Sequence, residues 1–188
     1  MYRLIILISH LFVFTSAFSS TYYSNNADIS ILTNWWTNSD GTGSNPSNFT
    51  SSGDIFEIQS GQICPISNNI TFGNGTVLII YGTLTVNGTS SLTIGSTTST
   101  AVCFQVKNGG TFSNQTTGNI TFYGAVQIDA GGTWSGTGTT GNNITFYSNL
   151  TNNSSIQITT PETHVVLIQL HMLFLQQLHY LSVQQLEL

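Results

Sequence analysis

Positively charged residues are almost absent from this chain of 188 residues, which has two Lys or Arg against seven Asp or Glu and a formal net charge of −5. A nucleic-acid binder needs Lys and Arg to displace counterions from phosphates, so this composition excludes one. It also argues against a polybasic protein of the membrane surface. Disordered chains usually have few aromatic residues. Because aromatics make up 11% of this chain, we expect an ordered fold.

Cysteine is equally scarce, with Cys64 and Cys103 as the only two. Two cysteines can form one intrachain disulfide, which requires their Cα atoms to lie within ~7 Å of each other. An exported protein would tolerate such a bridge. The sequence leaves two alternatives open, a disulfide between these residues or two unpaired thiols. The apolar residues of 102–106 alternate, which places Cys103 on the side opposite the core.

The segment 1–17 has the pattern of a secretory signal peptide. Arg3 supplies a positive start, Leu4–Phe14 is a mostly apolar run, and small residues close the segment at Ala17. The apolar run is too short to cross the ~30 Å hydrocarbon core of a bilayer. We therefore predict a secreted or cell-surface protein whose mature chain begins near Phe18 and contains no membrane span.

The body of the chain, 54–160, consists of short runs rich in Val, Ile, Thr and Phe that end near Gly or Asn, as strands do. Phe104–Ser113 matches Val126–Ser135 at an offset of 22 in the numbering, and 119–123 matches 143–147 at an offset of 24. Strand-length runs at such a period indicate a β-solenoid. Its coils must stack, because one coil cannot bury its own apolar face.

The predicted fold class is therefore all-β, a β-solenoid (parallel β-helix) with an N-terminal cap. Phe104 and Val126 should point inward from equivalent positions of successive coils, as should Phe112 and Trp134. The motif shared by 119–123 and 143–147 has a weaker copy at 69–73. This copy precedes 119–123 by about two repeats. The alternative is an antiparallel β-sandwich, which has no reason to repeat its turn sequence at a fixed spacing.

The segment 18–53 fits the repeat poorly, and we predict that it forms the N-terminal cap, since a solenoid needs an atypical unit over its first coil. It contains Trp35 and Trp36, which are the candidate binding residues because an exposed aromatic face suits a sugar ring. The alternative is that at least one of them packs over the end of the solenoid. Asp40–Asn45 resembles a calcium loop, but a single carboxylate is too few. We predict no metal and no other cofactor.

The solenoid carries few groups that could act as catalysts. Hydrolysis of a glycoside needs two carboxyl groups, one on either side of the bond. Asp54 and Glu57 lie three residues apart on one strand and should face opposite sides, while Asp129 lies several coils away. No catalytic residue is therefore predicted. A polysaccharide-acting β-helix enzyme remains an alternative.

The composition changes abruptly after Pro161. Residues 161–188 contain no Gly or Asn but eight Leu and five Gln. A helix here would be apolar all round, unlike an amphipathic surface helix, and polar residues interrupt a membrane anchor too often. A third interpretation is a shift of reading frame, because codons chosen for 176–181 encode Thr and Ser when moved by one nucleotide. Composition favours this third interpretation, so that the chain would be a truncated fragment of a larger protein. We expect its tail to be helical or disordered and not to extend the coil stack.

The segment Asn34–Phe49 resembles the start of large secreted surface proteins of the Bacteroidetes type. In those proteins a W-x-x-x-x-D-G-x-G-x-x-P-x-x-F opening precedes a stretch like Asp54–Gly61, and repeats like Gly82–Gly88 follow. The resemblance implies export by the type IX route and an adhesin-like role. We thus expect a secreted structural or adhesin-like protein without catalytic activity, with surface glycans as candidate partners. A carbohydrate-binding module is the other alternative.

Overall fold

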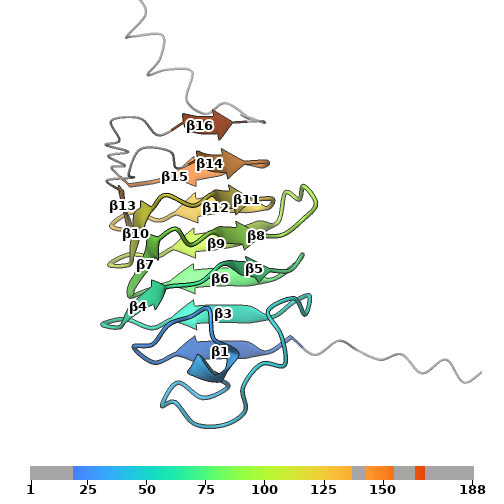
Figure 1. The fold of residues 1–188 in the computed structure, drawn as a ribbon, viewed down its shortest axis with the longest axis vertical. Helices are drawn as coiled ribbons and strands as arrows, with labels where there is room; N and C mark the ends of the chain where they lie inside the picture. Colours follow the sequence, from blue (N-terminus) through green and yellow to red (C-terminus); the bar gives the residue numbers. More distant parts are fainter. Residues whose placement is uncertain (1–18, 137–142, 155–163, 168–188) are drawn as a thin grey trace, which may run out of the picture.

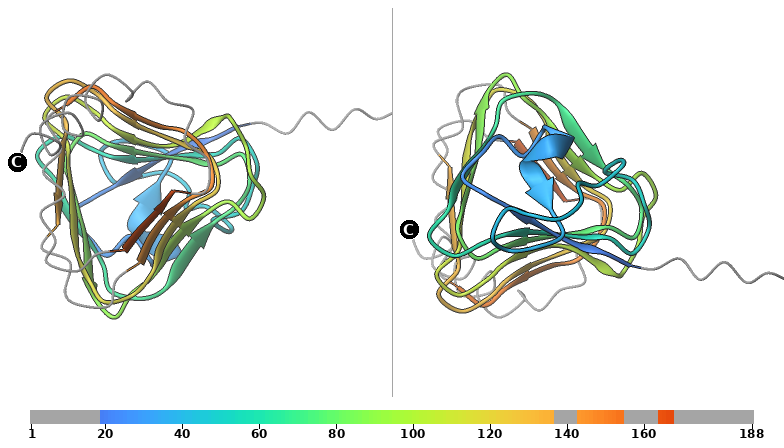
Figure 2. Two further views of the ribbon diagram at one scale, coloured as in Figure 1. Left: turned by 90° about the horizontal axis from the view of Figure 1, so that it is seen from above. Right: turned by 90° about the horizontal axis from the view of Figure 1, so that it is seen from below.

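The computed structural model describes residues 19–136, 143–154 and 164–167. Its strands stack into a prism with a triangular cross-section (Figures 1 and 2). Three sheets, named A, B and C here, form the three faces.

Sheet A contains, in order along the stack, β2 (Trp35–Trp36), β1 (Thr21–Ser24), β3 (Ile55–Ile58), β6 (Val77–Ile80), β9 (Val102–Val106), β12 (Ala125–Ile128) and β15 (Leu150–Asn152). Sheet B contains β4 (Ile63–Ile66), β7 (Thr83–Gly88), β10 (Thr111–Thr116) and β13 (Thr133–Gly136). Sheet C contains β5 (Ile70–Phe72), β8 (Leu92–Ile94), β11 (Ile120–Phe122), β14 (Asn143–Phe146) and β16 (His164–Leu167). A short 3-10 helix, η1 (Leu32–Asn34), precedes β2.

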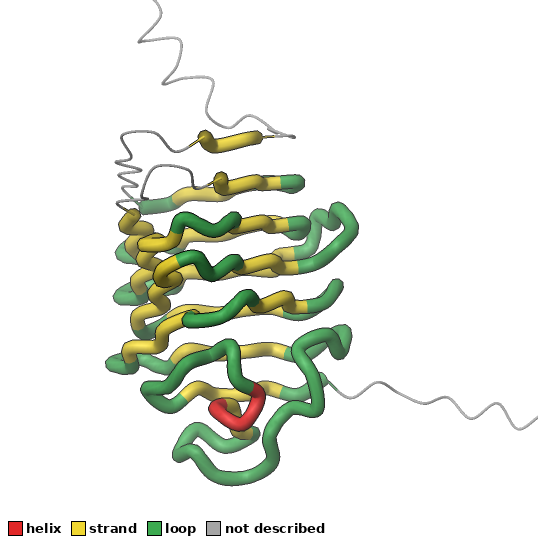
Figure 3. The backbone as a smooth tube through the Cα atoms, viewed as in Figure 1, coloured by secondary structure: helices red, strands yellow, loops and turns green. Residues whose placement is uncertain are grey.

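The chain passes from sheet A to B to C and returns to A, so that β3 to β14 make four complete coils. Between coils every strand pairs in parallel with its counterpart, which confirms the β-solenoid over the antiparallel sandwich. Phe104 pairs with Val126 and Phe112 with Trp134, as predicted, and all four side chains are buried. Figure 3 shows the turns and loops that join the strands of successive coils.

The spacing between coils varies with the length of one loop. In sheet A, Ile55 pairs with Val77 and Phe104 with Val126, both at the expected offset of 22. Leu78, however, pairs with Phe104 at an offset of 26, because the loop 95–101 between β8 and β9 is longer than its counterparts. The weak copy at 69–73 falls two coils before β11, as predicted, because β5 pairs with β8 and β8 with β11.

Alternation along each strand fills the interior with aliphatic and aromatic side chains. Phe104 lies at the centre of one aromatic cluster, with ring centroids 4.9 Å from Phe122 and 5.1 Å from Phe112. Burying one such side chain stabilises the fold by roughly 1.5–3 kcal/mol, so the stacked rows together hold the coils in place.

Glycine at the corner from sheet A to sheet B lets successive coils approach closely. A Cβ on Gly82 would lie 2.3 Å from the carbonyl oxygen of Gln59, and one on Gly110 would lie 2.2 Å from that of Ile80. Real Cβ atoms do not approach backbone this closely, so only glycine fits at these repeated positions.

The segment before Asp54 lies over the N-terminal end of the stack. Its strand β1 pairs in parallel with β3, and β2 pairs antiparallel with β1. Ile29 is fully buried, and its backbone N–H donates a hydrogen bond to the carbonyl oxygen of Pro65 at 3.0 Å. The parallel stack therefore begins at Thr21, earlier than the repeat in the sequence indicates.

One expectation about the tail is wrong. His164–Leu167 forms β16 and pairs in parallel with β14, so the coil stack does extend beyond Pro161. Although Gly and Asn are absent from the tail, it contains the run Val165–Leu167, whose β-branched and apolar residues suit a strand. The rest of the tail and the predicted signal peptide lie outside the described residues. Within the described part, no helix is long and apolar enough to cross a membrane.

Candidate functional site

The three outer faces of the prism differ in chemistry. The register aligns Thr83, Thr111 and Thr133 on the outside of sheet B. Four threonines align in the same way on sheet C: Thr71, Thr93, Thr121 and Thr145. These two rows thus present hydroxyl groups, whereas the corresponding row of sheet A contains an aromatic residue, a carboxylate and two amides.

One row of outward residues runs along sheet A from β1 to β12, and we name it the A column. Its members are successive Cα partners on neighbouring strands: Tyr23, Glu57, Ile79, Gln105 and Gln127. All five are partly exposed, while the residues before and after each of them on β3 to β12 mostly point into the core. Strands in a sheet lie about 4.8 Å apart, so the column is roughly 19 Å long.

The two tryptophans have different environments. Trp35 is fully buried, packs edge-on against Phe56 at 5.1 Å, and donates a hydrogen bond from Nε1 to the carbonyl oxygen of Ile29 at 3.0 Å. Trp36 lies opposite Tyr23 on the antiparallel neighbour strand and is only half-buried. Of the two predicted binding residues, only Trp36 is therefore placed to touch a ligand, and Tyr23 lies beside it.

Glu57 lies between Tyr23 and Ile79 in the A column. Burial among these neighbours raises the pKa of the Glu57 carboxyl above its ordinary value, because desolvation penalises the charged form. Asp54, by contrast, is buried and accepts a hydrogen bond from the backbone N–H of Ser20 at 3.0 Å. Its role is to join the first coil to the N-terminal segment.

The charged side chains at the far end of the column pair with each other. Lys107 Nζ lies 3.2 Å from Asp129 Oδ2, and Gln127 Nε2 donates to Asp129 Oδ1 at 2.6 Å. Both members of the ion pair follow inward valine or isoleucine residues at the end of their strands. Tyr81, 37% exposed, occupies the same position one coil earlier than Lys107.

The carboxylates on this face are too far apart for a glycosidase. Glu57 lies on β3 and Asp129 follows β12, three rungs away. At about 4.8 Å per rung, this separation is roughly 14 Å. Retaining and inverting glycosidases need roughly 5 to 9.5 Å between the two groups. These two carboxylates therefore cannot act together on one glycosidic bond.

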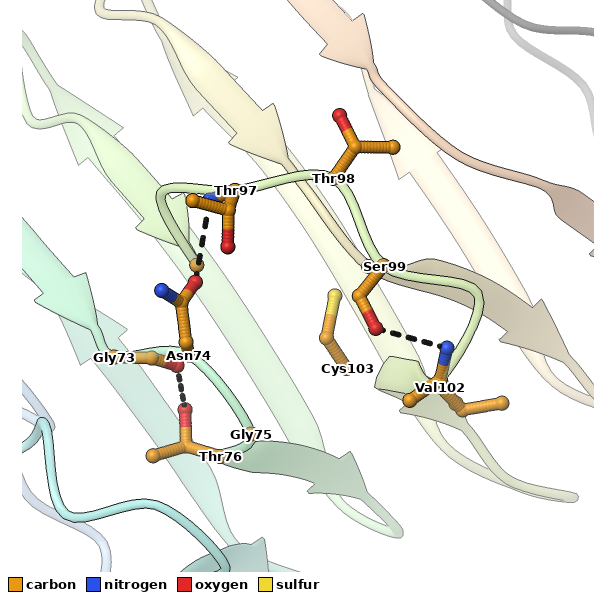
Figure 4. A pocket seen from close by; sticks show the side chains of 12 residues that line it. Gly73, Asn74, Gly75, Thr76, Thr97, Thr98, Ser99, Val102 and Cys103 are labelled. Atoms are coloured by element: carbon orange, nitrogen blue, oxygen red, sulfur yellow. Dashed lines mark hydrogen bonds between the residues drawn. The ribbon is translucent and has the colours of Figure 1, made fainter.

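A pocket of about 260 Å³ lies at the corner between sheets C and A, under the loop 95–101 (Figure 4). Its polar lining includes Asn74, Thr76, Thr97, Thr98 and Ser99. Asn74 Oδ1 already accepts hydrogen bonds from the backbone N–H groups of Ser96 and Thr97, at 2.8 and 3.2 Å. No charged residue lines the pocket, so it offers no general acid or base.

Cys103 lines the same pocket. It is an extra residue in β9, since Val102 pairs with Ala125 and Phe104 with Val126, and such a β-bulge leaves one residue unpaired. The sequence predicted Cys103 on the side opposite the core, whereas in the structure it is 7% exposed and belongs to the cluster of buried core residues, because the bulge breaks the alternation of β9. Burial raises the pKa of its thiol to about 11, so the thiol is protonated at neutral pH and is no nucleophile.

The two cysteines are free thiols in the structure, so the disulfide alternative is not realised. Cys64 lies on β4 in sheet B in the first coil, and its thiol contacts the Ser24 hydroxyl at 3.3 Å. Cys103 lies in sheet A two coils further on. The sequence could not place them, because their separation depends on which face each strand joins.

The loop Asp40–Asn45 forms a turn. Asp40 Oδ1 accepts hydrogen bonds from the backbone N–H and the hydroxyl of Thr42, at 3.0 and 2.6 Å. These bonds lower the pKa of the Asp40 carboxyl. Among the described residues there is no cluster of three His, Cys, Asp or Glu side chains that could hold a metal ion.

Sequence reasoning singled out Trp36 but missed its neighbours. Tyr23 lies in a segment without the repeat, and a lone Glu57 on a strand carries no sequence signal for binding. A signal did exist for Gln105 and Gln127, because they are identical residues at equivalent positions of the repeat and both face outward. Comparison of the chain with protein families, with characterised proteins and with solved structures found no match.

Proposed function

We propose that this protein is a secreted, non-catalytic structural solenoid of the cell surface that binds surface glycans in the manner of an adhesin, through the outer face of sheet A. The predicted signal peptide and the resemblance of Asn34–Phe49 to secreted surface proteins support the location. The observation that carries the binding role is the half-buried aromatic pair Tyr23 and Trp36, which are cross-strand neighbours at the head of the A column. Aromatic faces of this kind stack on apolar faces of sugar rings.

The remaining features of the face fit binding better than catalysis. Gln105 and Gln127 provide amide groups that can donate to and accept from sugar hydroxyls. The carboxylates lie three rungs apart, and the buried thiol is protonated. A rigid stack of parallel strands holds the row in place, so little conformational freedom is lost when a ligand binds.

The test is binding of the full mature chain to arrayed polysaccharides and to intact cells. Trp36→Ala should weaken binding about tenfold, a loss of about 1.4 kcal/mol. Thr121→Ala, on the outer face of sheet C, is the matched control and should bind like the wild type. Equal binding by both variants would contradict the proposal. So would the release of reducing sugar ends by the wild-type protein, because the proposed role is not catalytic.

A further inference from the structure

The A column is long, straight and regular, which bears on the shape of its ligand. Its residues recur once per coil from β1 to β12, roughly 19 Å along the stack axis at about 4.8 Å per rung. The row offers one outward side chain on each strand, in turn an aromatic ring, a carboxylate, an isoleucine and two amides, in steps comparable to the length of one hexose unit. A polymer can use every step, whereas a single sugar can use only one.

We infer that the ligand is an unbranched, neutral polysaccharide whose chain lies along the A column, with one end over Tyr23 and Trp36 and the other near Gln127. This inference rests on the proposed function and adds the ligand's class and direction. The aromatic pair holds one ring, and the amides of Gln105 and Gln127, which lie beyond Glu57 and Ile79, hold sugars further along the chain.

The charges of the face exclude an acidic polysaccharide. Lys107 is the only Lys or Arg among the described residues, and it pairs with Asp129 at 3.2 Å. Glu57 remains as a carboxylate without a cation beside it in the column. A polyanion would thus meet net negative charge and no unpaired cation, so hydrogen bonding to neutral hydroxyl groups is the chemistry that the face supports.

The amide of Gln105 is free to make such bonds. Its side chain is half-exposed and makes no hydrogen bond to any other described residue. Gln127, one rung further, uses its Nε2 on Asp129, which fixes the direction of its carbonyl oxygen. Gln105 is therefore the better probe of whether the ligand reaches past the aromatic pair.

The experiment measures affinity of the full mature chain for a neutral disaccharide and hexasaccharide of one linkage, taken from a polysaccharide bound on the array, and for polygalacturonate. We expect the hexasaccharide to bind at least tenfold more tightly than the disaccharide, and polygalacturonate not to bind. Gln105→Ala should weaken binding of the hexasaccharide about fivefold and leave binding of the disaccharide unchanged. Trp36→Ala should weaken the binding of both. Gln115→Ala, an exposed amide of the same coil on sheet B, is the control.

The outcomes separate this inference from the proposed function. Equal affinity for disaccharide and hexasaccharide would overturn the extended chain while leaving glycan binding intact. Tighter binding of polygalacturonate would overturn the neutral ligand class. If cells still retain the protein after their glycans have been removed, and no saccharide competes, then the partner is a protein and both proposals fail.

Discussion

At the scale of single residues, environment decides what each polar group contributes. Glu57 and Asp40 are both carboxylates, yet desolvation raises the pKa of one and hydrogen bonds to Thr42 lower the pKa of the other. Trp35 and Trp36 are neighbours in sequence, yet one is core and the other is half-exposed. Alternation along a strand is the cause, because successive side chains point to opposite faces.

Glu57→Gln should stabilise the protein at neutral pH. The folded-state pKa of Glu57 is raised above the ordinary 4.5, so the folded protein favours the protonated form. Its contribution to stability is therefore fully present below that ordinary value and is lost as the pH rises through the folded pKa. Glutamine removes the cost of burying a charge, so its melting temperature should exceed that of the wild type at neutral pH and not at acidic pH.

Asp40→Asn is the control, because it should change the melting temperature at neutral pH in the opposite direction. Its pKa is lowered in the folded state, so the stability it contributes is present above the ordinary value of 3.8 and is lost as the pH falls. This variant should melt slightly below the wild type at neutral pH. Thermal melts from acidic to neutral pH measure both effects. Melting temperatures that change in the same direction for both variants at neutral pH would contradict the prediction.

At the scale of elements, the N-terminal segment closes one end of the stack by combining β1, η1 and β2. Trp35 joins the segment to the first coil through Phe56. Phe49 extends the contact, with ring centroids 5.6 Å from Phe56 and 5.2 Å from Phe72. The segment thus covers apolar rings of the first coil that would otherwise face water.

Trp35→Ala should lower the free energy of unfolding by about 3–5 kcal/mol, the usual cost of replacing a buried large aromatic with alanine. Trp35→Phe keeps most of the packing and loses the hydrogen bond to Ile29, so about 1 kcal/mol is expected. Trp36→Ala should cost less than Trp35→Ala because Trp36 is only half-buried. Urea unfolding measures all three, and equal losses at positions 35 and 36 would contradict the burial seen here.

At the scale of the whole molecule, the solenoid is a nearly one-dimensional stack in which each coil contacts its neighbours. The two thiols sample this stack at separate places, Cys64 in the first coil and Cys103 in the third. Both are buried, and the pKa of Cys103 is about 11. They therefore report on whether the coils open together.

Neither thiol should react with Ellman's reagent in the folded protein, and both should react after denaturation. The physical reason is that the reagent must reach the sulfur atom, and both thiols are buried. Labelling at increasing urea should follow the same transition as circular dichroism. If neither thiol reacts in the denatured protein without a reducing agent, the two cysteines form a disulfide. If one thiol reacts at a lower urea concentration than the other, the coils open separately.

The sequence by itself determined the solenoid, because its evidence is local and repeated. Motifs that recur at a nearly constant spacing, with alternating apolar positions, require coils that stack and bury the same side chains. Phe104, Phe112, Val126 and Trp134 follow from that pattern alone.

Only the tertiary structure decided what lies side by side on the surface. Tyr23 and Glu57 lie far apart in the sequence and become neighbours because β1 joins sheet A before the repeat begins. Trp36 joins them because β2 pairs antiparallel with β1, and the sequence repeat does not predict this pairing. The separation of the cysteines and the addition of β16 have the same origin. They depend on which strand edge a segment meets, and that is a property of long-range pairing rather than of local sequence.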